Sequence, residues 1–418
     1  MIDPTIIREK PELVKENLKK RYKDPKLADE FLKYDIEWRK KQKELDNLRH
    51  ERNKKSSEIA KVKKSGGDIS EVIAEVKKID SQISELEKEV KLLNEKRISI
   101  LYKIPNILAE DVPIAESEEG SVTIKKWGST DKVLDITHDQ ILEKLNLLDT
   151  KKASEISGAR FYYLKNQLVQ LNLALIQFTI NHLIKRGFTP LWVPYMIKEE
   201  YMKGAAELED FKETLYKIEG ENLYLIPSAE QAIVPFHAGE IFQEGELPKK
   251  YVGFSTNFRR EAGAHGRDTK GIFRVHQFDK VEKIIFSKPE ESWKMFDLMV
   301  ETSEEVIQKL GLPYRLINIA SGDLNNSAAK KIDLEAWIPT QGKYRELMSC
   351  SNCTDYQARN LKIRVARSDG SIEYAHILNC TGIATERALV AIATNYYEDG
   401  KIIVPKALRK YVDFEVIG

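Results

Sequence analysis

The sequence predicts an α+β protein in two parts, an antiparallel coiled coil of two helices followed by a domain with a mostly antiparallel sheet flanked by helices. Three observations lead to this prediction. Residues 27–101 contain no proline and keep a three-four spacing of apolar residues, and the turn sequence at 65–68 interrupts that spacing. Beyond the proline-free stretch, short strand-like segments alternate with few helices. We expect domains at 1–104 and 105–418.

The coiled coil is predicted from heptad spacing on both sides of the turn. In the second helix the spacing begins at Ile69, and only Arg97 interrupts the apolar row. In the first helix it begins at Phe31 and has three basic interruptions. Such spacing over several heptads is typical of a coiled coil. Because Ser65-Gly66-Gly67-Asp68 permits positive φ and a helix cap, we expect the helices to fold back on each other, each spanning roughly 50 Å.

A basic stripe lies near the predicted tip of this hairpin. The formal net charge of the chain is only +1, but segment 49–64 holds seven Lys/Arg against two Glu. A local stripe of this kind can attract phosphates even on a neutral protein. A solvated helix face on a plain oligomerisation or spacer coiled coil is the alternative. The basic residues are Arg49, Arg52, Lys54, Lys55, Lys61, Lys63 and Lys64.

Composition and the start of the chain predict a soluble, cytoplasmic protein. Hydrophobic residues make up 42% and charged residues 32%, against about 25% charged residues in an average domain. No apolar run approaches the ~20 residues of a membrane-spanning helix, so we expect no membrane partner. The start, Met1-Ile2-Asp3-Pro4, lacks the pattern of a signal peptide. Three cysteines do not form a disulfide framework.

The second domain is expected to mix strands with few helices. A long amphipathic helix is predicted over 164–184. The predicted strands are 223–226, 253–257, 273–278, 283–287, 332–337 and 373–378.

Segment 258–282 carries the residues that indicate chemistry. It reads as a strand, a basic loop with glycines, and a second strand. Arginine's planar fork suits phosphate or carboxylate, carboxylates suit amines, and an aromatic ring can stack on a base. The sequence has neither GxxxxGK[ST] nor a strand-associated GxGxxG. A site for a nucleotide and an amine, and a surface hairpin with salt bridges, both fit. The residues are Arg259, Arg260, Glu261, Arg274, Phe278 and Glu282.

These residues resemble a known family. Phe258-Arg259-Arg260-Glu261 is similar to the Phe-Arg-x-Glu of motif 2 in class II aminoacyl-tRNA synthetases, and the longer run to Glu282 resembles seryl-tRNA synthetases in particular. The N-terminal hairpin resembles this family's tRNA-binding arm. Further segments follow in the family's order: 160–164 at the domain entry, 187–194 as motif 1 of the dimer interface, 226–230 as the Thr-x-Glu loop, 346–359, and 379–387 as motif 3.

The resemblance implies a class II catalytic domain that binds ATP, Mg²⁺ and L-serine. Arg259 and Arg387 would be catalytic, and Glu346 and Ser349 would bind Mg²⁺, which prefers oxygen ligands. The implied ATP-binding residues are Arg259, Arg260, Glu261, Arg274, Val275, Phe278, Glu346, Leu347, Met348, Ser349 and Arg387. The implied serine-binding residues are Ser228, Ala229, Glu230, Arg259, Glu282, Asn379 and Thr381.

The resemblance also implies the reaction and the partners. The family is a serine–tRNA ligase: ATP activates serine as seryl-adenylate, and the seryl group passes to the 3′ end of tRNA(Ser), or of tRNA(Sec) where an organism has one. It implies a homodimer in which the arm of one subunit, through its basic stripe, grips the long variable arm of tRNA bound at the other.

Departures and alternatives remain at this stage. Family members usually have Thr where Ser228 stands and small residues where Cys380 and Glu386 stand, so Glu386 would bring a carboxylate near the triphosphate. Cys350, Cys353, Cys380 and His376 could form a zinc site, although we expect none. Another class II synthetase, for threonine, proline or glycine, is one alternative. A synthetase-derived protein without catalysis and a coiled-coil structural protein are the others.

Overall fold

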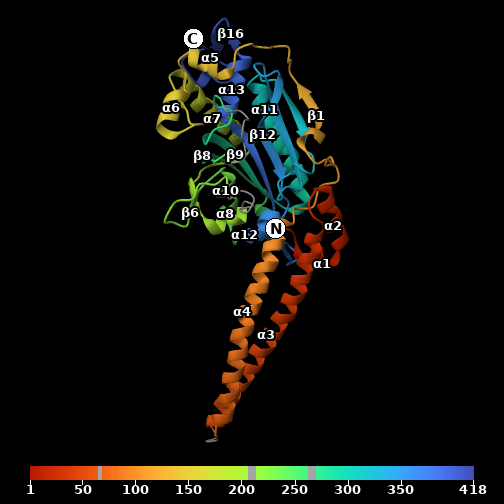
Figure 1. The fold of residues 1–418 in the computed structure, drawn as a ribbon. Coiled ribbons are helices and arrows are strands. Elements are labelled where there is room, and N and C mark those ends of the chain that lie inside the picture. The colour runs from red at the N-terminus through yellow and green to blue at the C-terminus, as the bar shows by residue number, and fades with distance from the viewer. Residues whose placement is uncertain (65–67, 206–212, 262–269) are drawn as a thin grey trace. The chain divides into compact units, whose positions relative to one another are not determined.

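The computed structural model describes residues 1–64, 68–205, 213–261 and 270–418. It forms two compact units, 1–105 and 106–418, the first helical and the second built around a large sheet (Figure 1). The predicted turn glycines Gly66 and Gly67 lie outside the described residues. Directly after them, Asp68 Oδ1 accepts a hydrogen bond from the amide of Ser70 at 2.9 Å, so Asp68 supports the start of the second long helix.

The first unit is a long helical hairpin that begins with two short helices. Its two long helices, α3 and α4, lie side by side (Figure 1). Their ion pairs show that they are antiparallel, because Lys41 Nζ lies 3.0 Å from Glu89, whereas Arg52, later in α3, lies 3.8 Å from the earlier Asp80. The helices are α1 (Pro4–Glu9), α2 (Pro11–Lys20), α3 (Lys26–Lys64) and α4 (Ser70–Lys103).

An apolar seam holds the two long helices together at the predicted heptad positions. Burial of these side chains is the main force between the helices, since each buried aliphatic side chain contributes about 1.5–3 kcal/mol. The predicted helix pairing is therefore confirmed. The buried residues of the seam are Leu45, Ile79, Ile83, Leu86 and Val90, with Trp38 and Leu48 packed against them.

A buried charged cluster joins α1, α3 and α4. Asp35 is 1% exposed and accepts hydrogen bonds from Arg8 Nε at 2.7 Å and Arg97 Nη1 at 2.9 Å. The Arg97 guanidinium also lies 4.1 Å from the centre of the Trp38 ring. The one basic residue in the heptad row of α4 is therefore neutralised by Asp35, which explains why the seam tolerates it.

The second unit is organised by an eight-stranded sheet. Neighbouring strands pair antiparallel, except that β4 runs parallel to β8. This arrangement confirms the predicted fold class. In sheet order the strands are β1 (Val122–Trp127), β10 (Tyr314–Asn318), β11 (Lys330–Ile338), β12 (Lys343–Asn352), β15 (His376–Ala384), β9 (Gln277–Ser287), β8 (Lys249–Phe258) and β4 (Thr189–Trp192).

Three helices cover one face of this sheet. Their apolar residues form one core with alternate residues of the strands. On β9, Val281 and Ile285 belong to this core, whereas Lys280 and Glu282 line a cavity on the other face. Because successive side chains of a strand point to opposite sides, one face of β9 is apolar and the other carries charge. The covering helices are α7 (Gln167–Lys185), α11 (Ser292–Lys309) and α13 (Thr385–Asn395).

Shorter elements complete the unit. A second apolar core joins α8, α10 and α12 to the cavity side of β9. The shorter helices are α5 (His138–Lys144), α6 (Thr150–Ser157), α8 (Glu199–Ala205), α10 (Glu230–Ile233) and α12 (Tyr356–Leu361). The shorter strands are β2 (Leu148–Asp149), β3 (Tyr163–Leu164), β5 (Met196–Lys198), β6 (Leu223–Leu225), β7 (Ile241–Gln243), β13 (Arg364–Ala366), β14 (Ile372–Tyr374), β16 (Tyr397–Glu398), β17 (Lys401–Ile403) and β18 (Val416–Ile417).

Most predicted elements are found, but one predicted strand is wrong and another is divided, because 373–378 spans the end of β14 and the start of β15 with Ala375 between them. The helix predicted over 164–184 is α7, but 273–278 is not a strand, because β9 begins only at Gln277. Ile272, Phe273 and Val275 lie in a loop, and their side chains are buried in the main core. Gly271, at the start of this loop, has a positive φ of +72°. The apolar character of the loop reflects this packing and not a strand. Among the helices of the described residues, none combines the length and apolarity needed to cross a membrane.

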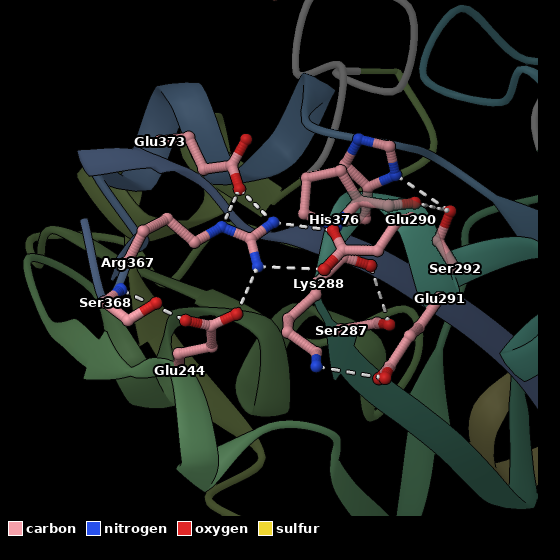
Figure 2. A network of polar contacts seen from close by, with 11 residues as sticks. Glu244, Ser287, Lys288, Glu290, Glu291, Ser292, Arg367, Ser368, Glu373 and His376 are labelled. Carbon is pink, nitrogen blue, oxygen red and sulfur yellow. Dashed lines mark hydrogen bonds and ion pairs between the residues drawn. The ribbon is translucent and has the colours of Figure 1, made fainter. Parts of the chain in front are cut away.

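An arginine-centred network fastens the small sheet of β7, β13 and β14 to the end of β9. Figure 2 shows the Arg367 guanidinium surrounded by the carboxylates of Glu244, Glu290 and Glu373. Arg367 Nη2 lies 2.6 Å from Glu290 Oε2, and this hydrogen bond lowers the pKa of Glu290 to about 2. Glu290 therefore stays ionised at all physiological pH values, and the network joins four chain segments.

The Asp35 cluster yields a stability prediction. Asp35→Ala should leave two guanidinium groups without a buried partner and destabilise the hairpin by roughly 3 kcal/mol. Hydrogen–deuterium exchange of the full chain should show amides of α3 and α4 near residue 35 exchanging about 100-fold faster. Asp46→Ala, an exposed carboxylate of the same helix, is the control and should change exchange little. Equal protection in both variants would contradict this account of Arg97.

Candidate active site

The cavity lies on the face of the sheet opposite α7, α11 and α13, and it brings most of the predicted site residues together. It has a volume of about 470 Å³ and adjoins a second cavity of about 190 Å³, with which it shares Arg259, Arg387 and Glu346. The predicted residues that line the first are Ser228, Glu230, Arg259, Glu261, Arg274, Glu282, Glu346, Ser349, Asn379, Thr381 and Arg387. Val275, Phe278 and Leu347 line the second.

Three predicted residues do not line either cavity. Met348 is 1% exposed and belongs to the core on the opposite side of β12. Ala229 is buried in the second core next to α10. Arg260 is exposed, and its backbone amide donates to Thr214 O at 2.8 Å. Their nearness in sequence to site residues therefore does not bring their side chains into the cavities.

Two carboxylates line the first cavity, the buried Glu282 and the partly buried Glu230, and they are held differently. Glu230 Oε1 accepts hydrogen bonds from the amides of Gln357 at 2.7 Å and Asn379 at 3.2 Å. Glu282 Oε2 lies 2.7 Å from Lys280 Nζ. Burial, with Glu282 nearby, raises the pKa of Glu230 to about 7. This part of the cavity therefore offers a strong site for a cation that carries hydrogen-bond donors.

A cation and a carboxylate meet at the centre of the cavity. Arg387 Nη1 lies 3.2 Å from Glu346 Oε2 and donates to its backbone oxygen at 3.0 Å. Although burial opposes it, Arg387 and Lys331 together lower the pKa of Glu346 below its ordinary value. Asp333 lies opposite Ser349 in the register of β11 and β12. Burial raises the pKa of the Asp333 carboxyl. Its Oδ1 is buried without a hydrogen-bond partner in the described structure.

Aromatic rings and arginines line the second cavity. The Arg259 guanidinium lies 5.1 Å from the ring centre of Phe278, and that of Arg387 lies 5.1 Å from the ring centre of Phe273. Arg274 Nη1 pairs with Glu261 Oε2 at 3.2 Å. Flat apolar faces next to guanidinium groups suit a planar ring attached to an anionic chain.

The structure resolves the position of Glu386, which the sequence suggested could disturb Arg387. Its carboxylate accepts hydrogen bonds from Tyr162 OH, from Thr385 Oγ1 at 3.2 Å and from the Asp279 amide at 3.0 Å. Burial, with Asp279 nearby, raises its pKa to about 7. Glu386 therefore serves to join α13 to β9, and Arg387 is paired with a different carboxylate.

The cysteines and His376 have different surroundings, although two of the cysteines are neighbours. Cys350 and Cys380 lie opposite each other across β12 and β15 and face the core. Cys353 Sγ accepts from Asn379, and His376 Nδ1 lies 2.9 Å from Ser292 Oγ (Figure 2). Within the described ranges, no three His, Cys, Asp or Glu residues are grouped as metal ligands. These four residues do not form a zinc cluster there.

Sequence reasoning missed several lining residues. Lys280 stands inside a family segment without an assigned role, although it lies two residues before Glu282 and so faces the same side of the strand. Lys331 and Asp323 come from β11 and the loop before it, which carries no motif that we recognised. The remaining missed residues include Asn325, Ser327 and Ser351.

The basic stripe of α3 is partly neutralised by α4. Arg49 lies 2.8 Å from Glu87, and Lys55 pairs with Glu75. Arg52 lies 3.8 Å from Asp80, whereas Lys54 and Lys61 are exposed. The side chains of Lys63 and Lys64 lie outside the described residues. Exposed pairs of this kind contribute little, about 0–1 kcal/mol, so a polyanion could compete with them.

Comparisons with known proteins place this cavity in a family. Residues 1–108 match the seryl-tRNA synthetase N-terminal domain, and 214–396 match the tRNA synthetase class II core domain (G, H, P, S and T). The chain is 48% identical to the serine–tRNA ligase of Pyrococcus abyssi over 100% of its length and 97% of the relative. The chain belongs to the seryl-tRNA synthetase family. The predicted family and the predicted class of enzyme, an aminoacyl-tRNA ligase, are thus confirmed.

Solved structures of seryl-tRNA synthetases have the same fold. The structure from Pyrococcus horikoshii, complexed with ATP, matches with a TM-score of 0.90 at 46% identity and covers 100% of this chain and 99% of that one. The cytoplasmic enzyme from Naegleria fowleri, in complex with AMP, matches with a TM-score of 0.86 at 38% identity over 100% and 98%. The class II synthetase fold predicted for the second domain is therefore confirmed.

Glu386 gives a second stability prediction. Glu386→Ala should leave the Tyr162 hydroxyl and the Asp279 amide without an acceptor and cost about 2–4 kcal/mol. Glu386→Gln should be close to wild type at pH 7, because both of those bonds reach Oε1, which glutamine keeps. Thermal unfolding of the three proteins measures these differences.

The pH dependence provides an internal control for Glu386. A carboxyl whose folded pKa is raised from 4.5 to about 7 favours the folded state at low pH, and this contribution is lost as the pH rises to about 7. The Gln variant should therefore gain stability relative to wild type between pH 5 and pH 8. A constant difference between the two would show that Glu386 ionises normally in the folded protein.

Proposed function

We propose that this cavity binds ATP and L-serine, joins them as seryl-adenylate, and passes the seryl group to tRNA(Ser). One observation carries the proposal most strongly. The carboxylates of Glu230 and Glu282, a pair of guanidinium groups and a Glu346–Ser349 oxygen pair share one cavity, and an aromatic-lined cavity adjoins it. A zwitterionic amino acid and a nucleoside triphosphate need this combination of groups. The family and the relatives described above support it.

The guanidinium groups bind the anionic parts of the substrates. Arg259 holds the α-phosphate and the serine carboxylate, a bidentate task for which lysine is poorly suited. Arg274 holds the outer phosphates, while Arg387 covers the adenine ring or reaches the γ-phosphate. Glu261 accepts from the adenine amino group, and Phe278 stacks on the ring. The 5.1 Å between Arg259 and Phe278 fits adjacent binding of phosphate and base.

Glu346 and Ser349 would hold Mg²⁺. Their oxygens are of the type that Mg²⁺ prefers, and Asp333, opposite Ser349, has a buried Oδ1 that makes no hydrogen bond within the described residues and would be a further acceptor nearby. Bound there, Mg²⁺ would neutralise charge on the phosphates. Arg259 and Arg387 contribute positive charge from the protein itself.

Serine is oriented by the acidic end of the cavity. Glu230 binds its ammonium group, and Glu282 with Thr381 forms hydrogen bonds with its hydroxyl. Ser228 and Asn379 complete a small polar pocket. The pocket excludes larger side chains by size, and it disfavours analogues without the hydroxyl because buried polar groups would then lack partners.

The reaction follows from this orientation. A serine carboxylate oxygen attacks the α-phosphorus, the bond to pyrophosphate breaks, and seryl-adenylate forms. The 3′-hydroxyl of the terminal adenosine of tRNA then attacks the seryl carbonyl, and AMP leaves. The catalytic contribution of the protein is position and charge neutralisation, so a histidine base is not required.

The partners follow from surfaces outside the cavity. The basic stripe of α3 contacts tRNA phosphates, and such arms read shape and charge more than sequence. Trp192 of the edge strand β4, within motif 1, is 80% exposed, which supports a homodimer through that element. The three buried free cysteines suit the reducing cytoplasm.

Amino-acid-dependent ATP–pyrophosphate exchange without tRNA is the test of this function. Exchange should strongly favour serine over threonine, alanine, glycine, cysteine and proline. Arg259→Ala should lower it at least ~1,000-fold, whereas Arg409→Ala, a surface arginine paired with Glu415, should leave it unchanged. Exchange with a different amino acid would overturn the serine assignment, and none at all from folded protein would overturn adenylation.

The pKa of Glu230 predicts how serine binding depends on pH. The serine ammonium needs ionised Glu230, whose pKa is about 7, so protonation should weaken binding below that pH. The KM for serine should rise about 5-fold between pH 7 and pH 6 and about 10-fold more by pH 5, while the KM for ATP should change little. A flat serine KM over this range would argue against Glu230 as the ammonium partner.

The arm should act on tRNA alone. Replacing the five lysines of the basic stripe with glutamine should weaken tRNA binding and reduce the slope of log affinity against log salt by up to about 4. Serine-dependent exchange should be unaffected. Lys294→Gln with Lys309→Gln, on the exposed side of α11, is the control. Unchanged tRNA affinity would identify the stripe as a solvated face. The lysines are Lys54, Lys55, Lys61, Lys63 and Lys64.

A further inference from the structure

Lys280 is a buried cation inside the cavity, and the proposed reaction gives this lysine no role. It lies two residues before Glu282 on β9, so both side chains point to the cavity. The residues are 8% and 2% exposed, and Nζ of Lys280 lies 2.7 Å from Glu282 Oε2. Lys280 also lines the adjoining cavity and therefore stands at the junction of the two.

The second carboxylate of the cavity has different partners. Glu230 Oε1 is held by the neutral amides of Gln357 and Asn379. Among the ion pairs of the described residues, none joins Glu230 to a lysine or arginine within 4.0 Å. Glu282 is thus in direct contact with a cation of the protein, whereas Glu230 makes its hydrogen bonds to neutral amides and interacts with Lys280 only at longer range.

This asymmetry assigns the two carboxylates to different groups of the substrate. A zwitterionic amino acid brings one ammonium group, which is best placed against the carboxylate that lacks a cation. Glu282, neutralised by Lys280, still has lone pairs for an uncharged donor, and Thr381 Oγ1 lies 3.5 Å from the same oxygen. Without Lys280, two carboxylates without a cation of the protein would face one ammonium, and either could take it.

We propose that Lys280 is a positioning residue that determines serine specificity: by pairing with Glu282 it reserves that carboxylate for the serine hydroxyl and leaves Glu230 to the ammonium. The inference rests on the proposed function. Lys280 acts through Glu282, so its removal should affect selection of the side chain more than it affects ATP.

The test compares kinetics of pyrophosphate exchange for serine and alanine in wild type, Lys280→Met and Lys280→Arg. Methionine keeps the length and removes the charge. We expect serine kcat/KM to fall about 100-fold, mainly through KM, with the serine-over-alanine ratio reduced at least 10-fold and the ATP KM within twofold. Arginine should restore part of the ratio. Lys288→Met, a lysine paired with Glu291 at 3.0 Å outside the cavity (Figure 2), is the matched control and should match wild type.

A double variant keeps the test independent of folding. Lys280→Met/Glu282→Gln leaves no unpaired charge, so it should unfold at or above the temperature of the single variant, and its serine-over-alanine ratio should be as low as that of Lys280→Met. A lower kcat in Lys280→Met, with serine KM and the ratio unchanged, would place Lys280 at the phosphate and overturn the proposal. Loss of serine-dependent exchange in wild type would instead overturn the proposed function.

Discussion

The cavity depends on the register of three neighbouring strands, β12, β15 and β9. In this register Thr381 lies opposite Glu282, and Asn379 lies opposite Ser351. Since strand side chains alternate between faces, the residues between them, such as Cys380, point into the helix-covered core. A slip of one residue would bury the polar set and expose the apolar set. The cost of both changes fixes the register, and the register in turn fixes where each cavity residue points.

Charge pairing then arranges the cavity before any substrate binds. Each buried charge is costly without a partner, and most are held by a neighbour: Arg387 by Glu346, and Lys280 by Glu282. Two charges differ: Glu230 is held by neutral amides and has a pKa of about 7, and Arg259 donates to the Pro227 carbonyl. A site whose charges are already fixed needs little rearrangement when charge develops in the reaction. Glu230 then marks where a cation is missing, and Arg259 where an anion is missing.

Pairs of opposite charges serve two purposes in the helical hairpin. Asp35 is buried between Arg8 and Arg97, so removing its carboxylate would destabilise the packing of α1, α3 and α4. Along its length, pairs such as Arg49 with Glu87 are exposed and weak. The first kind holds the hairpin together, whereas the second can be exchanged for other anions. A single charged hairpin can therefore be rigid and still have an adaptable basic surface.

The sequence by itself determined the helical hairpin, the mostly antiparallel sheet and many of the cavity-lining residues, because heptad spacing and family motifs are local patterns. Only the tertiary structure decided what such patterns leave open. It placed 273–276 in a packed loop, joined Glu386 to Tyr162 and Asp279 beside the second cavity, and set Lys280 against Glu282. The physical reason is that a buried residue takes its environment from segments distant in the chain: the partner of a charge, unlike the period of a helix, is fixed by packing.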